Sequence, residues 1–231
     1  MSTSHLLEDL GAGVWIRRDS LAMMPGIALP LATTVLRDAD GGLSLISPVS
    51  GIETWGPAVD ALGPVRTVIA PNGFHHLFAK AAWERYGAAS LVASAALQKK
   101  RPDFPATTRW LEGDARIDVA PGIAAFPVLG MKPVQEWVFL HEASRTLVVT
   151  DLLFHVLAPS FGLGLVQRAF GTYKKLAVSK LFVGARKDRD AYDRSLRVLQ
   201  GLDFDRLVVA HGEPILAGAK PRVVDALAVS P

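Results

Sequence analysis

Short apolar runs separated by turn residues make up the hydrophobic pattern of this chain. The run at residues 65–70 is rich in Val and Ile and predicts a buried strand. It stops at Pro71-Asn72-Gly73, because proline donates no backbone hydrogen bond and Asn-Gly favours a turn. The amphipathic stretch beyond this turn predicts a helix that ends near Tyr86. We therefore expect a strand, a loop and a helix, and loops beyond such strand ends commonly line ligand sites in open α/β sheets.

The alternation of apolar runs and turns continues on both sides of this segment. A hairpin is expected where residues 31–37 and 43–47 flank the turn sequence Asp-Ala-Asp-Gly-Gly. No repeat or linker interrupts the pattern, so residues 1–231 are predicted to form one domain. The other predicted elements are strands at 13–17, 91–94, 115–119, 123–128, 136–141, 146–150 and 206–210, and helices at 52–62, 161–187 and 188–202.

The composition is typical of a folded globular protein, with 50% hydrophobic and 20% charged residues among 231. The chain contains no cysteine, which excludes disulfide bonds, thiolate metal ligands and a cysteine nucleophile. A bound metal would therefore depend on His, Asp or Glu side chains. The formal net charge of +3 is too small to favour a nucleic-acid-binding surface, so no nucleic-acid partner is predicted.

No membrane partner is predicted either. Residues 1–13 contain Glu8 and Asp9 and lack the basic and long apolar segments of a signal peptide. No run of about 18 apolar residues occurs, and we expect a cytoplasmic location. Residues 161–187 mix aromatic and aliphatic side chains with lysines, a composition that could bind a membrane surface or an acidic partner. We favour a helical cover for the core, with its apolar side chains buried and its lysines in water.

Side chains that commonly bind metals follow three of the predicted strands. Because the ends of neighbouring strands converge in space, such side chains can meet although they are far apart in the sequence. Three imidazoles and one carboxylate suit zinc, with iron or manganese as alternatives. The plain alternative for the His-His pair is one histidine in the core and one at the surface. The candidates are His75 and His76 after the strand at 65–70, Asp151 after 146–150, and His211 after 206–210.

These residues resemble the motifs of the metallo-β-lactamase fold superfamily. In that superfamily one strand ends in His-x-His-x-Asp-His, a later strand ends in a bridging Asp, and a last strand ends in His-Gly. Here residues 71–76 stand at the first motif, Asp151 at the bridging position, and His211-Gly212 at the last. The resemblance covers roughly residues 31–214, and the form Pro-Asn-x-Phe-His-His is similar to a bacterial lactamase-like branch. It implies an α/β (α+β) fold, a four-layer αββα sandwich.

The departures from the family motif concern its first metal site. Pro71 and Gly73 stand where the family has two histidines, and neither side chain can bind a metal. The family's middle histidine falls near residues 130–133, where Lys132 is the nearest polar candidate. The resemblance therefore implies at most one divalent metal ion, in the second site. Its ligands would be His75, His76, Asp151 and His211, with His75 in place of the family's aspartate.

Three further side chains are candidates for roles around the metal. Lys132 could place a fixed positive charge beside a substrate oxygen, or it is an exposed loop lysine. Asn72 could donate a hydrogen bond into the pocket, although an Asn-Gly turn explains it equally well. His155 could orient a ligand residue, or it packs in the core.

The leading functional hypothesis is a hydrolase that uses one metal ion and a metal-activated water. Asp151 and Lys132 are its predicted catalytic residues, and its small-molecule substrate is an ester, lactone, amide or phosphoester. The alternative is a non-catalytic protein of the same fold that binds a small ligand in the vestigial pocket. The loss of two motif histidines favours the alternative, whereas the retained strand-end residues favour the hydrolase.

Overall fold

The computed structural model describes residues 6–131 and 134–228, and in this part of the chain the strands form two sheets. The seven-stranded sheet has its strands in sequence order, and the five-stranded sheet has the order β12-β11-β10-β9-β8. The first sheet contains β1 (Glu8–Asp9), β2 (Val14–Met24), β3 (Ile27–Arg37), β4 (Leu43–Ile46), β5 (Val65–Ala70), β6 (Ser90–Ser94) and β7 (Arg109–Leu111). The second contains β8 (Ile117–Ala120), β9 (Ile123–Pro127), β10 (Trp137–His141), β11 (Thr146–His155) and β12 (Arg206–Gly212).

Both sheets are mixed. The strands from β1 to β4 pair antiparallel, and those from β4 to β7 pair parallel. In the second sheet only the β11–β12 pair is parallel. The helices are α1 (Ile52–Asp60), α2 (Ala79–Arg85), the short 3₁₀ helix η2 (Ala95–Leu97), α3 (Phe161–Phe170), α4 (Lys180–Gly184), α5 (Arg189–Gly201) and α6 (Ala219–Ala228).

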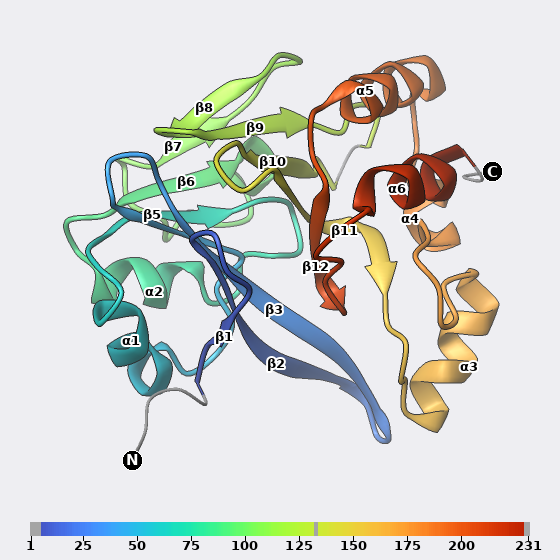
Figure 1. Ribbon diagram of the computed structural model, residues 1–231, viewed down its shortest axis with the longest axis horizontal. Coiled ribbons are helices and arrows are strands. Elements are labelled where there is room, and N and C mark those ends of the chain that lie inside the picture. Colours follow the sequence, from blue (N-terminus) through green and yellow to red (C-terminus); the bar gives the residue numbers. More distant parts are fainter. Residues whose placement is uncertain (1–5, 132–133, 229–231) are drawn as a thin grey trace.

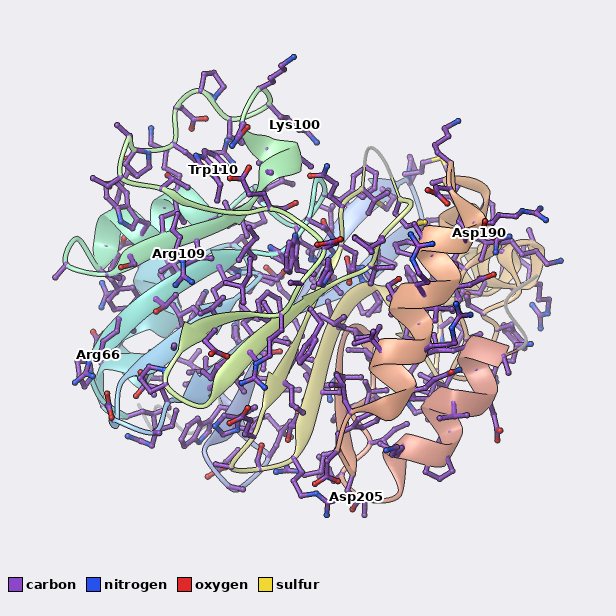
Figure 2. All side chains as sticks on the ribbon, turned by 90° about the horizontal axis from the view of Figure 1, so that it is seen from above. Arg66, Lys100, Arg109, Trp110, Asp190 and Asp205 are labelled. Atoms are coloured by element: carbon purple, nitrogen blue, oxygen red, sulfur yellow. The ribbon has the colours of Figure 1, made fainter. Side chains whose placement is uncertain are left out.

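The two sheets pack face to face, and helices cover their outer faces. Val148 and Val208 point into the core between the sheets, whereas their neighbours Val149 and Val209 point into the core under α5 and α6. Successive side chains of a strand alternate in this way, so each sheet is apolar on both faces. Figure 1 shows α1 and α2 on one side of the molecule and α5 and α6 on the other, and Figure 2 shows side chains filling the space between the sheets. The predicted αββα sandwich is confirmed.

The structure corrects the predicted helix at 161–187. Residues 161–170 and 180–184 form two separate helices, because Gly171 ends α3 with a left-handed backbone conformation (φ 78°). The expected burial of the apolar side chains is also only partly right. Leu163 and Phe182 are buried, but Phe161 is 84% exposed and Leu181 is 67% exposed. Among the described residues, none of the helices is both long enough and apolar enough to cross a membrane.

The strand predicted at 146–150 is longer than expected and continues to His155. Its pairing with β12 shifts register between Val149 and Phe154, which marks an irregularity of the bulge type. Asp151 therefore lies in an irregular part of β11 and not beyond its end. Bulges redirect side chains, and this one lies where the site forms.

Candidate functional site

Three of the predicted metal ligands meet where β5, β11 and β12 approach one another. His75 lies in the loop after β5, Asp151 lies in the irregular part of β11, and His211 is the penultimate residue of β12. The His75 Nε2 atom is 3.1 Å from His211 Nε2 and 3.4 Å from Asp151 Oδ2. The His211 Nε2 atom is 3.2 Å from Asp151 Oδ1. One potential ligand atom from each residue lies within 4.8 Å of the others.

The backbone at the end of β12 requires glycine next to His211. Gly212 has φ 124°, a conformation that L side chains rarely adopt. A Cβ atom at this position would also collide with the carbonyl group of His155 on the paired strand. The His-Gly sequence thus allows β11 and β12 to approach closely at the point where His211 faces Asp151.

Hydrogen bonds on the far side of each ring orient the two imidazoles. The Nδ1 atom of His211 is 2.8 Å from the carbonyl oxygen of Pro30, which can only accept, so Nδ1 carries the proton and Nε2 has a free lone pair. The Nδ1 atom of His75 is 2.6 Å from the Ser47 hydroxyl, which can donate or accept, so either nitrogen of this ring can carry the proton. With its proton on Nε2, His75 can donate to the lone pair of His211 Nε2 at 3.1 Å; with its proton on Nδ1, two lone pairs would face each other. The position between the two rings therefore suits a proton or a metal ion.

The electrostatics of the three residues agree with this conclusion. Burial opposes a charge on His75, but the carboxylates of Asp151 and Glu136 outweigh it and raise the pKa of His75 above the ordinary 6.5. Burial likewise disfavours the Asp151 anion, yet the charge and hydrogen bond of His75, together with the His211 ring beside it, hold the pKa of Asp151 below its usual range. Asp151 therefore supplies a lasting negative charge to any cation at the site.

His76 is not part of this group. Its Nδ1 atom is 2.9 Å from the Arg101 guanidinium, which also donates to the His76 carbonyl oxygen at 2.6 Å. Because arginine only donates, Nδ1 of His76 is an acceptor there. Burial, Lys100 and Arg101 lower the pKa of His76 to about 4. The structure thus brings together three of the four predicted ligands, and directs the fourth ring towards Arg101.

Asn72 lies directly behind the group. Its side-chain nitrogen donates to Asp151 Oδ2 at 2.7 Å, and its side-chain oxygen accepts from the backbone nitrogens of Phe74 (2.7 Å) and His75 (2.8 Å). One side chain therefore ties the loop that contains His75 to the carboxylate of Asp151. A turn-forming role and a positioning role coexist in this residue.

Glu136 is a buried carboxyl group that the sequence analysis did not single out. Its Oε1 atom accepts from the backbone nitrogens of Thr150 (2.9 Å) and Asp151 (3.0 Å) and from the Thr150 hydroxyl (2.8 Å). Its other oxygen accepts from the Asn72 side chain. Burial, assisted by the Asp151 charge, raises the pKa of Glu136 to about 7. The sequence offered only one signal, an acidic residue directly before an apolar strand.

The ring of His155 makes its hydrogen-bond contacts away from the three ligands. The Nδ1 atom of His155 is 2.7 Å from the Glu213 carbonyl oxygen, and its Nε2 atom is 3.2 Å from the Arg222 guanidinium. These contacts link β11 to the residues after β12 and to α6. Lys132 lies outside the described residues.

A pocket of about 580 Å³ opens over the site. This volume is within the range of about 300–1,000 Å³ that is common for small-molecule sites. His75, Asp151 and His211 lie on its wall together with Ser47, and most of the other lining residues are apolar. The arrangement places a polar, cation-binding group at one point of an otherwise apolar pocket.

The structure resembles solved metallo-β-lactamases over nearly the whole chain. The enzyme from Hirschia baltica has a TM-score of 0.66 at 14% identity, covering 97% of this chain and 96% of the other. The metallo-β-lactamase from Pontibacter korlensis has a TM-score of 0.65 at 15% identity, and the match covers 96% of this chain and 98% of the other. The metallo-β-lactamase FIM-1 from Pseudomonas aeruginosa, in its mono-zinc form, has a TM-score of 0.65 at 14% sequence identity. The match covers 97% of this chain and 95% of FIM-1. No family model and no curated protein sequence matches the chain. This chain therefore has the metallo-β-lactamase fold.

Proposed function

We propose that this chain is a metal-dependent hydrolase of small molecules that holds one divalent ion between His75, Asp151 and His211. The observation on which the proposal depends is the pair of imidazole Nε2 atoms that face each other at 3.1 Å beside a carboxylate. Two imidazoles and one carboxylate form a donor set suited to zinc, with iron or manganese as alternatives. The likeness to a mono-zinc structure of the same fold supports this assignment.

A divalent ion in such a site supplies a Lewis acid and lowers the pKa of water to about 7. The protein residues position the donors for it. Pro30 and Ser47 fix the two rings so that each Nε2 atom points to the shared centre. Asn72 fixes the Asp151 carboxylate. The lowered pKa of Asp151 makes it a weak proton acceptor, so its proposed role is to hold the ion.

The proposed stoichiometry is one ion per chain. Pro71 and Gly73 offer no side-chain donor where the fold family has its first site. His76, proposed from the sequence as a fourth ligand, would have to leave Arg101 to take part. The proposed role of Lys132, a positive charge beside the substrate oxygen, falls outside the described residues.

A second candidate is a non-catalytic protein that binds a small ligand in the same pocket. The observation that favours it is the set of hydrogen bonds around His75, because a protonated His75 ring satisfies Asp151 and His211 without any metal. In this alternative a proton takes the place of the ion, and the pocket serves binding alone.

Elemental analysis of protein purified without an affinity tag separates the two candidates. The hydrolase proposal expects one zinc, iron or manganese ion per chain, and chelator-sensitive hydrolysis in a panel of esters, lactones, amides and phosphoesters. His211→Ala should lose the ion and the activity. His155→Gln removes an imidazole whose contacts lie elsewhere and should keep both. Protein that binds none of the three metals, when they are added, would favour the non-catalytic alternative.

A further inference from the structure

A buried amide without a partner lies in the wall of the pocket. Gln167, on α3, is 3% exposed and lines the pocket. Neither its side-chain nitrogen nor its side-chain oxygen has a hydrogen-bond partner among the described residues. Leaving a buried polar group unpaired is unfavourable, so such groups normally have a partner in the functional state. Gln167 thus offers one donor and one acceptor to a molecule in the pocket.

Most of the other residues that line the pocket are apolar. They come from the β2–β3 hairpin, from the loop after β5, and from α3 and α4. A molecule that fills the pocket must therefore have a largely apolar body. The apolar lining residues include Leu21, Ile27, Leu29, Phe154, Val166 and Phe170.

Apolar side chains also surround the mouth of the pocket. Met24 at the hairpin tip is 58% exposed, Phe74 beyond β5 is 56% exposed, and Leu181 on α4 is 67% exposed. Single exposed apolar residues are common, but these three come from separate elements and line one opening. Their arrangement favours entry of a ligand with an apolar chain.

The charged groups of the pocket favour a neutral polar group on the ligand. Lys100 lines the pocket, but its Nζ atom donates to the Gly73 carbonyl oxygen at 2.6 Å and lies 5.6 Å from the centre of the Phe74 ring. Gln167 itself is uncharged and presents both a donor and an acceptor. A ligand amide matches it, because an amide has a C=O that accepts and an N–H that donates.

We propose that the pocket binds lipophilic acyl amides, with Gln167 as the residue that recognises the amide group. This inference names the substrate class of the same site and so rests on the proposed function. The apolar chain would lie along the hairpin and α3, and the polar group would pair with Gln167. Recognition by Gln167 requires no metal, so binding can be measured apart from catalysis.

Binding to chelator-treated protein tests the proposal without interference from hydrolysis. N-methyldecanamide and methyl decanoate share one chain length and differ only in N–H versus O. N-methylbutanamide has the amide without the long chain. We expect wild-type protein to bind N-methyldecanamide at least tenfold more tightly than N-methylbutanamide, and about fivefold to tenfold more tightly than methyl decanoate, as measured by calorimetry.

Gln167→Leu keeps the size of the side chain and removes both polar atoms. It should abolish the preference for the amide over the ester while the preference for the long chain remains. Gln200→Leu makes the same change on α5, away from the pocket, and should retain both preferences. Equal binding of the short and long amides by wild-type protein would overturn the proposal, as would an amide preference that survives Gln167→Leu. A chain that binds no metal yet shows both preferences would refute the hydrolase and leave this inference standing.

Discussion

Two polar clusters lie side by side in this structure, and they differ in how their hydrogen-bonding capacity is used. The open cluster consists of His75, Asp151 and His211 and faces the pocket. The closed cluster consists of Asn72, Glu136 and Thr150, all of which are fully or almost fully buried. In the closed cluster every carboxylate oxygen has a donor. In the open cluster two ring nitrogens face each other beside a carboxylate, where a proton or a metal ion can bridge them.

The comparison shows why burial and a shifted pKa do not by themselves identify a functional residue. Glu136 has a pKa raised to about 7, a value often associated with catalytic acids and bases. However, both of its oxygens accept hydrogen bonds from the protein, and it does not line the 580 Å³ pocket. The open cluster is the better candidate because its ligand atoms converge on one point and its residues line the pocket.

The largest expected effect is the response of the open cluster to metal. An ion that binds only the folded state stabilises it by about 4 kcal/mol at a thousandfold excess over its dissociation constant. For a chain of this size this corresponds to a rise in melting temperature of about 8–16 °C. Thermal unfolding with zinc and with chelator should differ by this amount in wild-type protein and hardly at all in His211→Ala. If chelator, zinc, manganese and iron all leave the melting curve unchanged, the open cluster binds no metal.

The next effect concerns the closed cluster. Glu136→Leu should lower the free energy of unfolding by about 3 kcal/mol, because it leaves buried donors of Thr150 and Asn72 without an acceptor. The loss should be present in chelator-treated protein. Glu142→Leu removes an exposed carboxylate six residues further along, and should change stability by at most about 0.5 kcal/mol. Chemical denaturation gives both values, and equal losses would show that the closed cluster has no special role.

A smaller effect is expected where a hydrogen bond supports a ligand of the open cluster. Ser47→Ala removes the hydroxyl group next to His75 Nδ1 and should weaken zinc binding about tenfold, or about 1.4 kcal/mol. Ser44→Ala is the matched control, because the Ser44 hydroxyl is also buried but has no hydrogen-bond partner among the described residues. Zinc titration by calorimetry should separate the two variants. Equal affinities would show that Ser47 does not position His75.

The sequence predicted the layers more completely than the site. The apolar runs were sufficient to predict the strands, because successive side chains of a strand face opposite sides of the sheet. Val148 and Val149 therefore had to enter opposite cores, whatever residues they pack against. The sequence could not decide which ring of the His75–His76 pair would join Asp151 and His211, since the position of the His76 ring depends on Arg101, 25 residues further along. The only local signal for Glu136 was an acidic residue next to an apolar strand, because its partners at 72 and 150 become neighbours only in the folded chain.

The smallest effect compares a histidine of the open cluster with an enclosed one at the far end of β10. The Nε2 atom of His141 is 2.8 Å from the Arg37 carbonyl oxygen, and its Nδ1 atom is 2.7 Å from the Ser144 hydroxyl. Burial lowers the pKa of His141 below the ordinary 6.5, with the Arg206 charge acting in the same direction. The folded state therefore prefers the neutral ring.

The consequence is a loss of stability in acid that is independent of metal. Above pH 6.5 the His141 ring is neutral in both states, and its contribution to stability is fully present. As the pH falls below this value the unfolded state binds a proton first, so the free energy of unfolding decreases until the folded pKa is passed. One group contributes at most about 1.4 kcal/mol per pH unit. In chelator-treated protein, His141→Gln should flatten the decrease between pH 7.5 and pH 5, while the zinc-induced shift at pH 7.5 remains that of the wild type. An unchanged acid slope would show that His141 does not titrate differently on folding, and a lost zinc shift would connect this end of β10 to the open cluster.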